Sequence, residues 1–536
     1  MAPTEPNHGW ALADVWDDHA DRFPAEIALV DDRVRLPWYA FRSRAHAIAA
    51  GLAGLGVGSG AHVGVALHNR SEYLEIVYAL SVARMVHVNT NYRYSTAELT
   101  SLWTDMHDDT VFFDATMTDR IDAVRALLPA IRWVAVDDPS PPWATSYDEL
   151  LQADEDWQPP SRRSGNDLLI ICTGGTTGQP KGVMWRQDDA FRALRVRAFG
   201  PHVAELPDSF DRHFLHDVVT RPGPVGLPAA PLMHATGLLN AISWLMAAGT
   251  AVTVPGRFDP IRLLDAIERE RVEVLALVGD AFALPIAATL DAEPTRWNID
   301  SLSRVVSSGV AWSADVKARL IAHNPGLTLV DGLGASEAVG MAAITTTAAD
   351  DGGTTFTPSQ HAVIVDDAGR IDTSSDAVGR IGVAGHVPLG YLDDPQRSAE
   401  VFPTINGRRY SVPGDFVERQ PDGRLRLLGR GSGCINTGGE KVYPDEVEAV
   451  IRAHPQVVDV AVIGHPDPRW GQRVIAVVEP VADGLEPVAV TEWSKQLLAG
   501  YKVPRTVILV DSLRRGPNGK LDYAALRKTT AERLGP

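Results

Sequence analysis

The chain has 536 residues, of which 45% are hydrophobic and 22% are charged, the proportions of a folded globular protein large enough for more than one domain. Its net charge of −18 repels phosphate backbones and anionic lipid surfaces, which argues against sequence-independent binding to nucleic acid. The two cysteines, Cys172 and Cys434, are too few for a disulfide scaffold and favour the cytoplasm.

From the N-terminus onward, short apolar runs alternate with stretches of helical period. Apolar side chains at steps of three and four predict a first helix over residues 11–23. The apolar stretch 272–290 contains charged residues and a proline, so we expect it in the core rather than in a membrane, and the N-terminus does not resemble a signal peptide. Further strands are predicted at 62–67, 111–113, 168–172 and 251–254, and further helices at 73–84 and 260–271. This alternation predicts a layered α/β architecture.

Three stretches of this part of the chain are set apart from the pattern. Residues 200–228 lack a clear period, and we expect a long surface loop there. Residues 56–61 match a dinucleotide-binding glycine pattern, but they follow a helix and precede a strand, so we expect a turn. His213 and His216 with Asp217 supply too few ligands to predict a metal site.

A glycine-rich segment separates a smaller C-terminal region. Three glycines within residues 429–433 give the backbone unusual freedom, so this segment is either a hinge near Ser432 or an ordinary turn. A helix beginning near Pro444 is predicted after it, followed by strands at 457–463, 474–478 and 506–510 and a helix at 492–498. We therefore expect a large N-terminal domain, residues 1–429, and a small mobile α+β domain, residues 430–536.

The segment 173–182, Thr-Gly-Gly-Thr-Thr-Gly-Gln-Pro-Lys-Gly, directly follows a predicted strand. Its glycines allow main-chain N–H groups to face an anion, its threonines add donors, and Lys181 adds a positive charge. The spacing does not fit the loop of P-loop nucleotidases, because Lys181 follows a proline and precedes a glycine. The segment predicts a phosphate-binding loop of another kind, with a plain turn as the alternative.

Five further strings occur in order along the chain, at residues 231–237, 331–337, 410–415, 438–448 and 517–520. Together with the loop at 173–182, they resemble the signature motifs of the adenylate-forming superfamily, which includes acyl-CoA synthetases, luciferases and the adenylation domains of peptide synthetases. The resemblance covers essentially the whole chain. It implies ATP, Mg²⁺ and coenzyme A as cofactors and a small domain that moves between two half-reactions.

The resemblance also implies a role for individual residues. In this family one motif shapes the acyl pocket beside the carboxylate, one C-terminal loop lines the path of the pantetheine arm, and one C-terminal lysine bridges the carboxylate and the α-phosphate during adenylation. The implied catalytic residues are Lys520, His234 and Glu337; the implied ATP or AMP contacts are Thr173, Thr176, Thr177, Lys181, Ser308, Gly309, Val310, Asp331, Leu333, Ser336, Asp415 and Arg430; the implied coenzyme A contacts are Gly438, Gly439 and Lys441; and Glu337 with Thr177 is implied for Mg²⁺.

Three positions depart from the pattern of the family. Leu333 stands where an aromatic residue commonly stacks on adenine, and Ser308-Gly309-Val310 replaces a Gly-Gly-Ala run in the same pocket. Ser432 stands at a hinge position that is usually Asp or Lys. These departures bear on affinity for ATP and on the bias of the hinge.

The chain is therefore interpreted as an acyl-CoA ligase that forms an acyl-adenylate and then transfers the acyl group to coenzyme A with release of AMP. It resembles bacterial ligases for fatty, steroid side-chain or diterpenoid acids, including those of the platensimycin pathway of antibiotic biosynthesis, which predicts a bulky hydrophobic acid. The alternatives are a ligase that only makes the thioester from a preformed adenylate, a luciferase-like or carrier-acylating enzyme, and a non-catalytic acyl or nucleotide binding module. A homodimer is left open, since homodimers are frequent among relatives.

Overall fold

We describe the protein from a computed structural model. It divides into two compact units, which are considered one at a time: a first unit formed by Met1–Gly353 with Ala384–Ser411, and a second formed by Thr354–Val383 with Val412–Pro536. The predicted boundary at residue 429 stays a prediction. The structure describes residues 9–153, 157–160, 163–174, 180–309, 312–350, 353–430, 435–437, 440–467, 471–482, 484–498, 500–515 and 521–534.

Two mostly parallel sheets form the frame of the first unit. In the first sheet the strand order is β15-β14-β13-β12-β10-β11-β1-β2, and in the second it is β20-β9-β8-β4-β3-β5-β6-β7. The strands of the first sheet are β1 Ile27–Val30, β2 Arg35–Pro37, β10 Val225–Pro228, β11 Thr250–Val252, β12 Val274–Leu277, β13 Arg304–Ser308, β14 Thr328–Ala335 and β15 Ala338–Thr346. Those of the second are β3 His62–Ala66, β4 Val86–Asn89, β5 Asp108–Phe113, β6 Arg132–Ala135, β7 Thr145–Ser146, β8 Leu168–Gly174, β9 Pro180–Arg186 and β20 Gly390–Tyr391.

Helices cover both faces of each sheet. The helices of the first unit are α1 Leu12–Arg22, α2 Trp38–Gly54, α3 Ser71–Ala83, α4 Thr96–Asp105, α5 Thr118–Arg125, α6 Tyr147–Leu150, α7 Gln187–Phe199, α8 Arg212–Val218, α9 Ala235–Met246, α10 Pro260–Glu270, α11 Gly279–Ala292, α12 Ala314–His323 and α13 Pro395–Val401. Within the described ranges, every helix falls short of the length and apolarity that a bilayer span requires.

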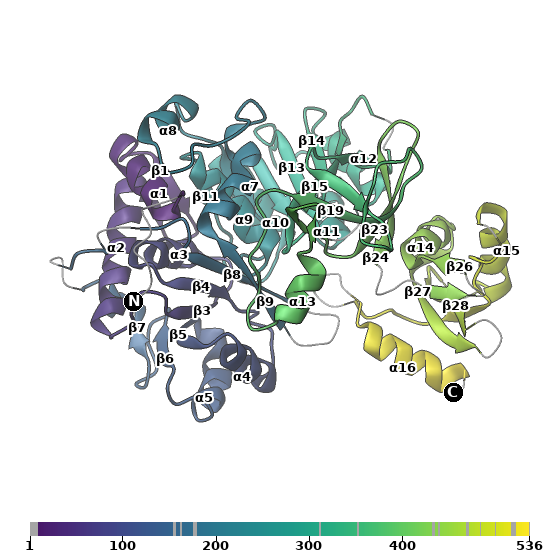
Figure 1. The fold of residues 1–536 in the computed structure, drawn as a ribbon, viewed down its shortest axis with the longest axis horizontal. Helices are drawn as coiled ribbons and strands as arrows, with labels where there is room; N and C mark the ends of the chain where they lie inside the picture. The colour runs from purple at the N-terminus through teal and green to yellow at the C-terminus, as the bar shows by residue number, and fades with distance from the viewer. Residues whose placement is uncertain are drawn as a thin grey trace. The chain divides into compact units, whose positions relative to one another are not determined.

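The core follows from the alternation of side chains along the strands. In β5, Phe112 faces the central helices α1, α2, α3, α7 and α9, whereas Val111 and Phe113 face α4 and α5. In β12, Ala276 faces the central helices, whereas Leu275 and Leu277 face α10, α11 and α12. Figure 1 shows the helices of this unit packed around its strands. The central helices thus lie between the two sheets, which confirms the predicted layered α/β architecture.

Most of the predicted elements of the first unit are present. The helix predicted at 11–23 is α1, the strand predicted at 62–67 is β3, and the helix predicted at 260–271 is α10. Residues 56–61 form a turn between α2 and β3, as predicted, with Gly56 at a positive φ of 81°. The long loop predicted at 200–228 is wrong in part, because α8 and β10 lie within it. Asp211 caps α8 by accepting hydrogen bonds from the backbone N–H groups of His213 and Phe214.

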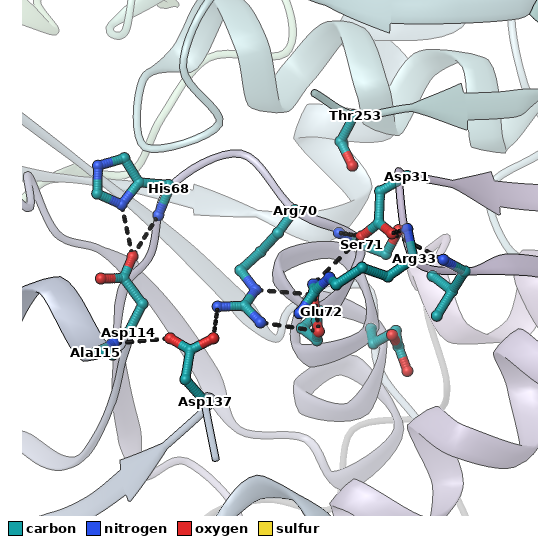
Figure 2. A network of polar contacts seen from close by, with 12 residues as sticks. Asp31, Arg33, His68, Arg70, Ser71, Glu72, Asp114, Ala115, Asp137 and Thr253 are labelled. Carbon is teal, nitrogen blue, oxygen red and sulfur yellow. Dashed lines mark hydrogen bonds and ion pairs between the residues drawn. The ribbon is translucent and has the colours of Figure 1, made fainter. Parts of the chain in front are cut away.

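A network of charged side chains joins the two sheets where their strands end (Figure 2). Arg70, which is buried at the start of α3, donates to both oxygens of Glu72 and to Asp137 beyond β6. Glu72 also accepts from Arg33, which lies beside β1. Because these carboxylates surround it, the pKa of Arg70 is raised, and the guanidinium stays charged in the interior. The network fixes α3 against strands of both sheets.

The second unit contains two smaller sheets. One joins β18-β17-β19 to the hairpin of β23 and β24, and the other has the order β26-β25-β28-β27 with β29 beside β28. The predicted α+β elements of the C-terminal region are all found. The strands of these two sheets and the helices of the unit are β17 Ala362–Val365, β18 Ile371–Asp372, β19 Val378–Ala384, β23 Asp415–Arg419, β24 Leu425–Arg430, β25 Ile435–Thr437, β26 Glu440–Val442, α14 Pro444–Arg452, β27 Val457–Asp467, β28 Gly471–Pro480, α15 Pro487–Leu497, β29 Thr506–Leu509 and α16 Tyr523–Leu534.

Candidate active site

The predicted phosphate-binding segment lies on a β-hairpin of the second sheet in the first unit. Strands β8 and β9 pair antiparallel, with Thr173 directly opposite Lys181. Side chains directly opposite each other in such a ladder share one face, so the Thr173 hydroxyl and the Lys181 ammonium lie on the same side of the hairpin. Thr176 and Thr177, which were also predicted to contact phosphate, lie outside the described residues.

A second hairpin of the first unit presents the predicted metal and α-phosphate residues. Ser336 and Glu337 form the two-residue turn between β14 and β15, in which Ala335 pairs with Ala338. The indole N–H of Trp185, on β9, donates to the Ser336 carbonyl at 2.8 Å. This bond connects the turn to the strand that carries Lys181, so residues more than 150 positions apart in the sequence lie at one site.

Tyr391, at the end of the short strand β20, links the two hairpins directly. Its hydroxyl donates to Glu337 Oε1 at 2.7 Å, and the Lys181 ammonium lies 5.6 Å from the centre of its ring. Lys181 Nζ also donates to Asp394 Oδ2 at 2.7 Å. The Glu337 backbone carbonyl accepts a hydrogen bond from the Ser411 hydroxyl at 2.6 Å. A cation and a carboxylate suited to a metal-bound triphosphate therefore share one aromatic side chain.

The loop before His234 is held by Asn69, which lies between β3 and α3. The Asn69 side chain donates to the carbonyls of Pro228 and Ala230 and accepts from the Leu232 N–H, at distances of 2.7 to 3.2 Å. His234 then occupies the N-cap position of α9, with extended backbone angles. The fold thus fixes the main chain on which His234 is presented.

The same loop is tied to the phosphate hairpin by Asn89 at the end of β4. The Asn89 side-chain amide donates to the carbonyl of Met233, next to His234, and to the carbonyl of Cys172, next to Thr173. It also accepts the N–H of Cys172. One side chain therefore positions both the predicted acyl-pocket loop and the start of the phosphate loop.

The predicted adenine-pocket segments lie side by side on β13 and β14. These strands are parallel, with Ser308 opposite Gly332, and the Ser308 hydroxyl lies 2.8 Å from the Thr236 hydroxyl of α9. Gly309 follows at a φ of +90°, a conformation that favours glycine. Leu333, the residue of β14 after Gly332, is half-buried, and Val310 lies outside the described residues. Ser308, one of the departures from the family pattern, thus lies at the end of β13 beside α9.

Asp331 has a partner that the sequence did not indicate. Lys317, on α12, donates to Asp331 Oδ2 at 3.3 Å, and both residues are buried. Burial raises the pKa of Asp331, while the nearby ammonium lowers it. The contact shows a buried ion pair at a position predicted to contact the nucleotide.

Cys172 immediately precedes the phosphate loop but is not suited to covalent catalysis. Burial raises the pKa of its thiol well above the usual value, so the thiol stays protonated near neutral pH. Acyl transfer through a thioester on this residue is therefore disfavoured, and Cys434 lies outside the described residues.

In the second unit, two of the predicted residues lie opposite each other in a pair of antiparallel strands. Asp415 begins β23 and is directly opposite Arg430 at the end of β24. Asp415 is buried. The backbone of Lys441 lies in β26 opposite Asn436. Ser432, Gly438, Gly439 and Lys520 lie outside the described residues.

The sequence analysis missed several residues of the site, among them Tyr391, Asp394, Lys317, Asn69 and Asn89. Only Tyr391 and Asp394 carried any signal, a Gly-Tyr-Leu-Asp-Asp string typical of a turn. In the described part of the chain, no group of three or more His, Cys, Asp or Glu side chains could hold a metal ion. His216, set aside as a ligand, lies 2.9 Å from the buried carboxylate of Asp18.

Comparisons with known proteins place this geometry in context. A family model described as "AMP-binding enzyme" matches residues 16–392, and one described as "AMP-binding enzyme C-terminal domain" matches residues 446–520. A medium/long-chain-fatty-acid and 3-oxocholest-4-en-26-oate CoA ligase of Mycolicibacterium smegmatis is 33% identical over 540 residues, covering 97% of each chain.

Solved structures show the same fold. The anthranilate CoA ligase AuaEII in complex with anthranoyl-AMP has a TM-score of 0.82 at 19% identity, with 99% of each chain covered. ATP-bound MatB from Rhodopseudomonas palustris has a TM-score of 0.80 at 25% identity, covering 97% of this chain and 99% of that one. The similarity extends over the whole length of this chain.

Proposed function

The chain belongs to the AMP-binding enzyme family, as the resemblance to adenylate-forming enzymes predicted, and from this premise we propose that it is an acyl-CoA ligase for a bulky hydrophobic carboxylic acid. The carboxylate attacks the α-phosphorus of ATP, which gives an acyl-adenylate and pyrophosphate. The thiolate of coenzyme A then attacks the acyl carbon and expels AMP. The first step converts a poor leaving group into a good one, and the second keeps the activation as a thioester.

The observation that carries the ATP half of this proposal is that Lys181 and Glu337 both contact Tyr391, one through its ring and the other through its hydroxyl. An ammonium beside a hairpin loop of small residues and hydroxyls suits the β- and γ-phosphates, with Thr173, Thr176 and Thr177 as further donors. Ser336 would contact the α-phosphate. Asp415 and Arg430 would contact the ribose, and Ser308, Gly309, Val310, Asp331 and Leu333 would line the adenine pocket.

Mg²⁺ fits this site as an ion bound mainly through the substrate. Mg²⁺ prefers oxygen ligands and is commonly held by one or two carboxylates plus phosphates, rather than by an all-protein cage. Glu337 offers such a carboxylate, oriented by the Tyr391 hydroxyl, and Thr177 offers a hydroxyl. When bound, the ion would neutralise charge on the phosphates.

The acid would bind beside His234, on the loop that Asn69 and Asn89 hold in place. The printed names of the relatives include fatty acids and a steroid side-chain acid, and this chain resembles them over nearly its full length. We therefore propose an acid of those classes.

The thioester half of the reaction rests on the C-terminal region. We propose residues 1–429 and 430–536 as the two domains, with a hinge at Ser432. Gly438, Gly439 and Lys441 would line the path of the pantetheine arm, and Lys520 would serve adenylation. The ground for these roles is the resemblance of residues 438–448 and 517–520 to the family's motifs, together with the match of the C-terminal family model.

We also propose a cytoplasmic location and a homodimer. The first rests on the cysteine content, since Cys172 and Cys434 are too few for a disulfide scaffold, which is typical of reducing compartments. The second rests on the frequency of homodimers among adenylate-forming enzymes, and light scattering of the purified chain would test it.

A screen of carboxylic acids with ATP and coenzyme A tests the proposed function, with AMP and thioester measured separately. Medium-chain, long-chain, steroid side-chain and diterpenoid acids make up the panel. We expect both products in equal amounts with a bulky acid, and neither with Lys181→Ala. Lys495→Ala, which alters an exposed lysine of α15 paired with Glu492, is the matched control and should behave as the wild type.

Other outcomes would replace the proposal. Thioester formed only from a supplied acyl-adenylate would show an enzyme limited to the second half-reaction, to which the Leu333 and Ser308 departures would point. AMP formed without any dependence on coenzyme A would indicate a luciferase-like or carrier-acylating enzyme. Ligand binding without turnover would indicate a binding module.

A further inference from the structure

Lys181 is already paired within the protein before any nucleotide is considered. Its ammonium donates to Asp394 at 2.7 Å, and the two side chains are 27% and 35% exposed, so the pair lies at the edge of the site where water and solutes reach it. The hydrogen bond from Lys181 holds the pKa of Asp394 below its usual range, so this carboxylate is ionised at neutral pH. A negative charge therefore lies against the cation expected to bind phosphate.

Asp394 is held in this position by the elements around it. Its Oδ1 caps α13 by accepting from the N–H of Arg397 at 2.9 Å, while its Oδ2 accepts from Lys181. The preceding strand β20 pairs with β9, with Tyr391 opposite Val183, and the Leu392 N–H donates to the carbonyl of Gly182, next to Lys181. The carboxylate is therefore braced on the same strand that carries its partner.

We propose that Asp394 is a positioning residue that competes with the triphosphate of ATP, and with pyrophosphate, for the ammonium of Lys181. The inference rests on the proposed function, in which Lys181 binds the β- and γ-phosphates. In the free enzyme Asp394 neutralises Lys181 and keeps it above the Tyr391 ring. When pyrophosphate departs, Lys181 and Asp394 form their ion pair again.

The physical reason is a balance of charges at one cation. A partly exposed ion pair is weak enough for phosphate to displace, but breaking it still subtracts from the free energy of phosphate binding. The retained carboxylate also repels the anionic phosphates at short range. Both effects weaken ATP and pyrophosphate alike, which lowers affinity without opposing the chemical step and lets the product leave.

Tyr391 completes the arrangement because it contacts both charged groups. Its hydroxyl holds Glu337, and its ring lies under Lys181. Moving Lys181 between Asp394 and phosphate therefore does not require a new position for Glu337. The exchange is confined to one ammonium.

The test measures the dissociation constants of pyrophosphate and of ATP with magnesium by calorimetry on the full-length chain. Asp394→Asn and Asp394→Ser both remove the charge, and both new residues can still cap α13, so a change in binding shared by the two variants reports the charge rather than loss of the cap. Asp393→Asn is the matched control, since Asp393 is the adjacent carboxylate but pairs with His107 at 2.6 Å rather than with Lys181. Melting temperatures check that each variant folds.

We expect both Asp394 variants to bind pyrophosphate and ATP about three- to tenfold more tightly, and Asp393→Asn to change binding by less than about twofold. Inhibition by pyrophosphate should strengthen by the same factor. In a Lys181→Ala background the effect of Asp394→Asn should shrink to the part that comes from direct repulsion between the carboxylate and the phosphates. Unchanged or weaker binding by folded Asp394 variants would overturn this inference alone. Absence of ATP and pyrophosphate binding by the wild type would overturn the inference and the proposed function together.

Discussion

The two ends of the proposed chemistry are built differently. In the first unit, Lys181, Glu337 and the loop before His234 come from distant segments, and direct side-chain bonds to Tyr391, Asn69 and Asn89 hold them. In the second unit, Asp415, Arg430 and Lys441, the predicted residues that the structure describes there, are placed by pairing between strands. The predicted ATP-binding residues of the first unit therefore depend on contacts between distant side chains, and loss of one buried partner should disturb the others. The C-terminal residues are instead expected to act through their own charge or size.

The largest expected effect comes from removing a buried partner in the first unit. Lys317→Ala leaves the buried carboxylate of Asp331 without its cation, which should lower the free energy of unfolding by about 3 to 5 kcal/mol. Guanidinium unfolding measures the change. Asp331→Asn in the same background should restore most of the loss, because the charge is then gone as well. A change of less than 1 kcal/mol would show that the pair does not stabilise the site.

The next largest effect is expected from a lysine of the C-terminal region. Lys520→Ala should slow adenylation, measured as exchange of pyrophosphate into ATP, by about 10²- to 10³-fold, because a charge that stabilises the transition state is lost. Thioester formation from a synthetic acyl-adenylate should stay within about twofold. Lys528→Ala, an exposed lysine of α16, serves as the control. Equal losses in both half-reactions would contradict the assignment.

Glu448, the last residue of the motif at 438–448, tests how burial affects a carboxyl of the second unit. Burial raises its pKa to about 7, with a further rise from the nearby Asp445 and with one oxygen accepting from the Val462 N–H. The folded state therefore binds a proton that the unfolded state has released, and stability falls as pH rises from about 4.5 to about 7.

Glu448→Gln should remove that dependence. The variant should gain up to about 3 kcal/mol over the wild type at pH 8 and nothing at pH 4, since 1.36 kcal/mol corresponds to each pKa unit. Unfolding curves across this pH range measure it, with the exposed Glu486→Gln as control. Parallel curves for the wild type and Glu448→Gln would show that the carboxyl is not buried in solution.

The smallest effect concerns close packing behind His234. A Cβ atom at Gly237 would lie 2.4 Å from the Pro231 carbonyl oxygen and 2.6 Å from that of Ala230, so the loop must shift. Gly237→Ala should cost about 1 to 3 kcal/mol of stability and raise the KM for the acid more than that for ATP. Gly54→Ala, where a Cβ meets open space, should be neutral or slightly stabilising. Equal behaviour of the two variants would contradict this packing.

The sequence predicted the elements better than their contacts. Helical period located α1 and α10, and the apolar run before the glycine-rich loop located β8, because such patterns are local. Helix α8 was missed because the capping Asp211 lies in a polar, proline-rich stretch without an apolar period. The hydrogen bond from Lys181 to Asp394 spans 213 positions, and Lys317 resembles any solvated lysine until α12 packs on β14. Side-chain partners set by tertiary packing leave no such local pattern.

A single-turnover experiment tests the central claim most directly. The enzyme is mixed with a bulky acid and ATP without coenzyme A, quenched in acid and analysed for acyl-AMP, and a parallel sample is chased with coenzyme A. We predict that acyl-AMP accumulates to about one equivalent per active site and is converted to acyl-CoA and AMP in the chase. Absence of acyl-AMP with every acid, combined with acyl-CoA formed from a supplied adenylate, would contradict the claim that this chain performs both half-reactions.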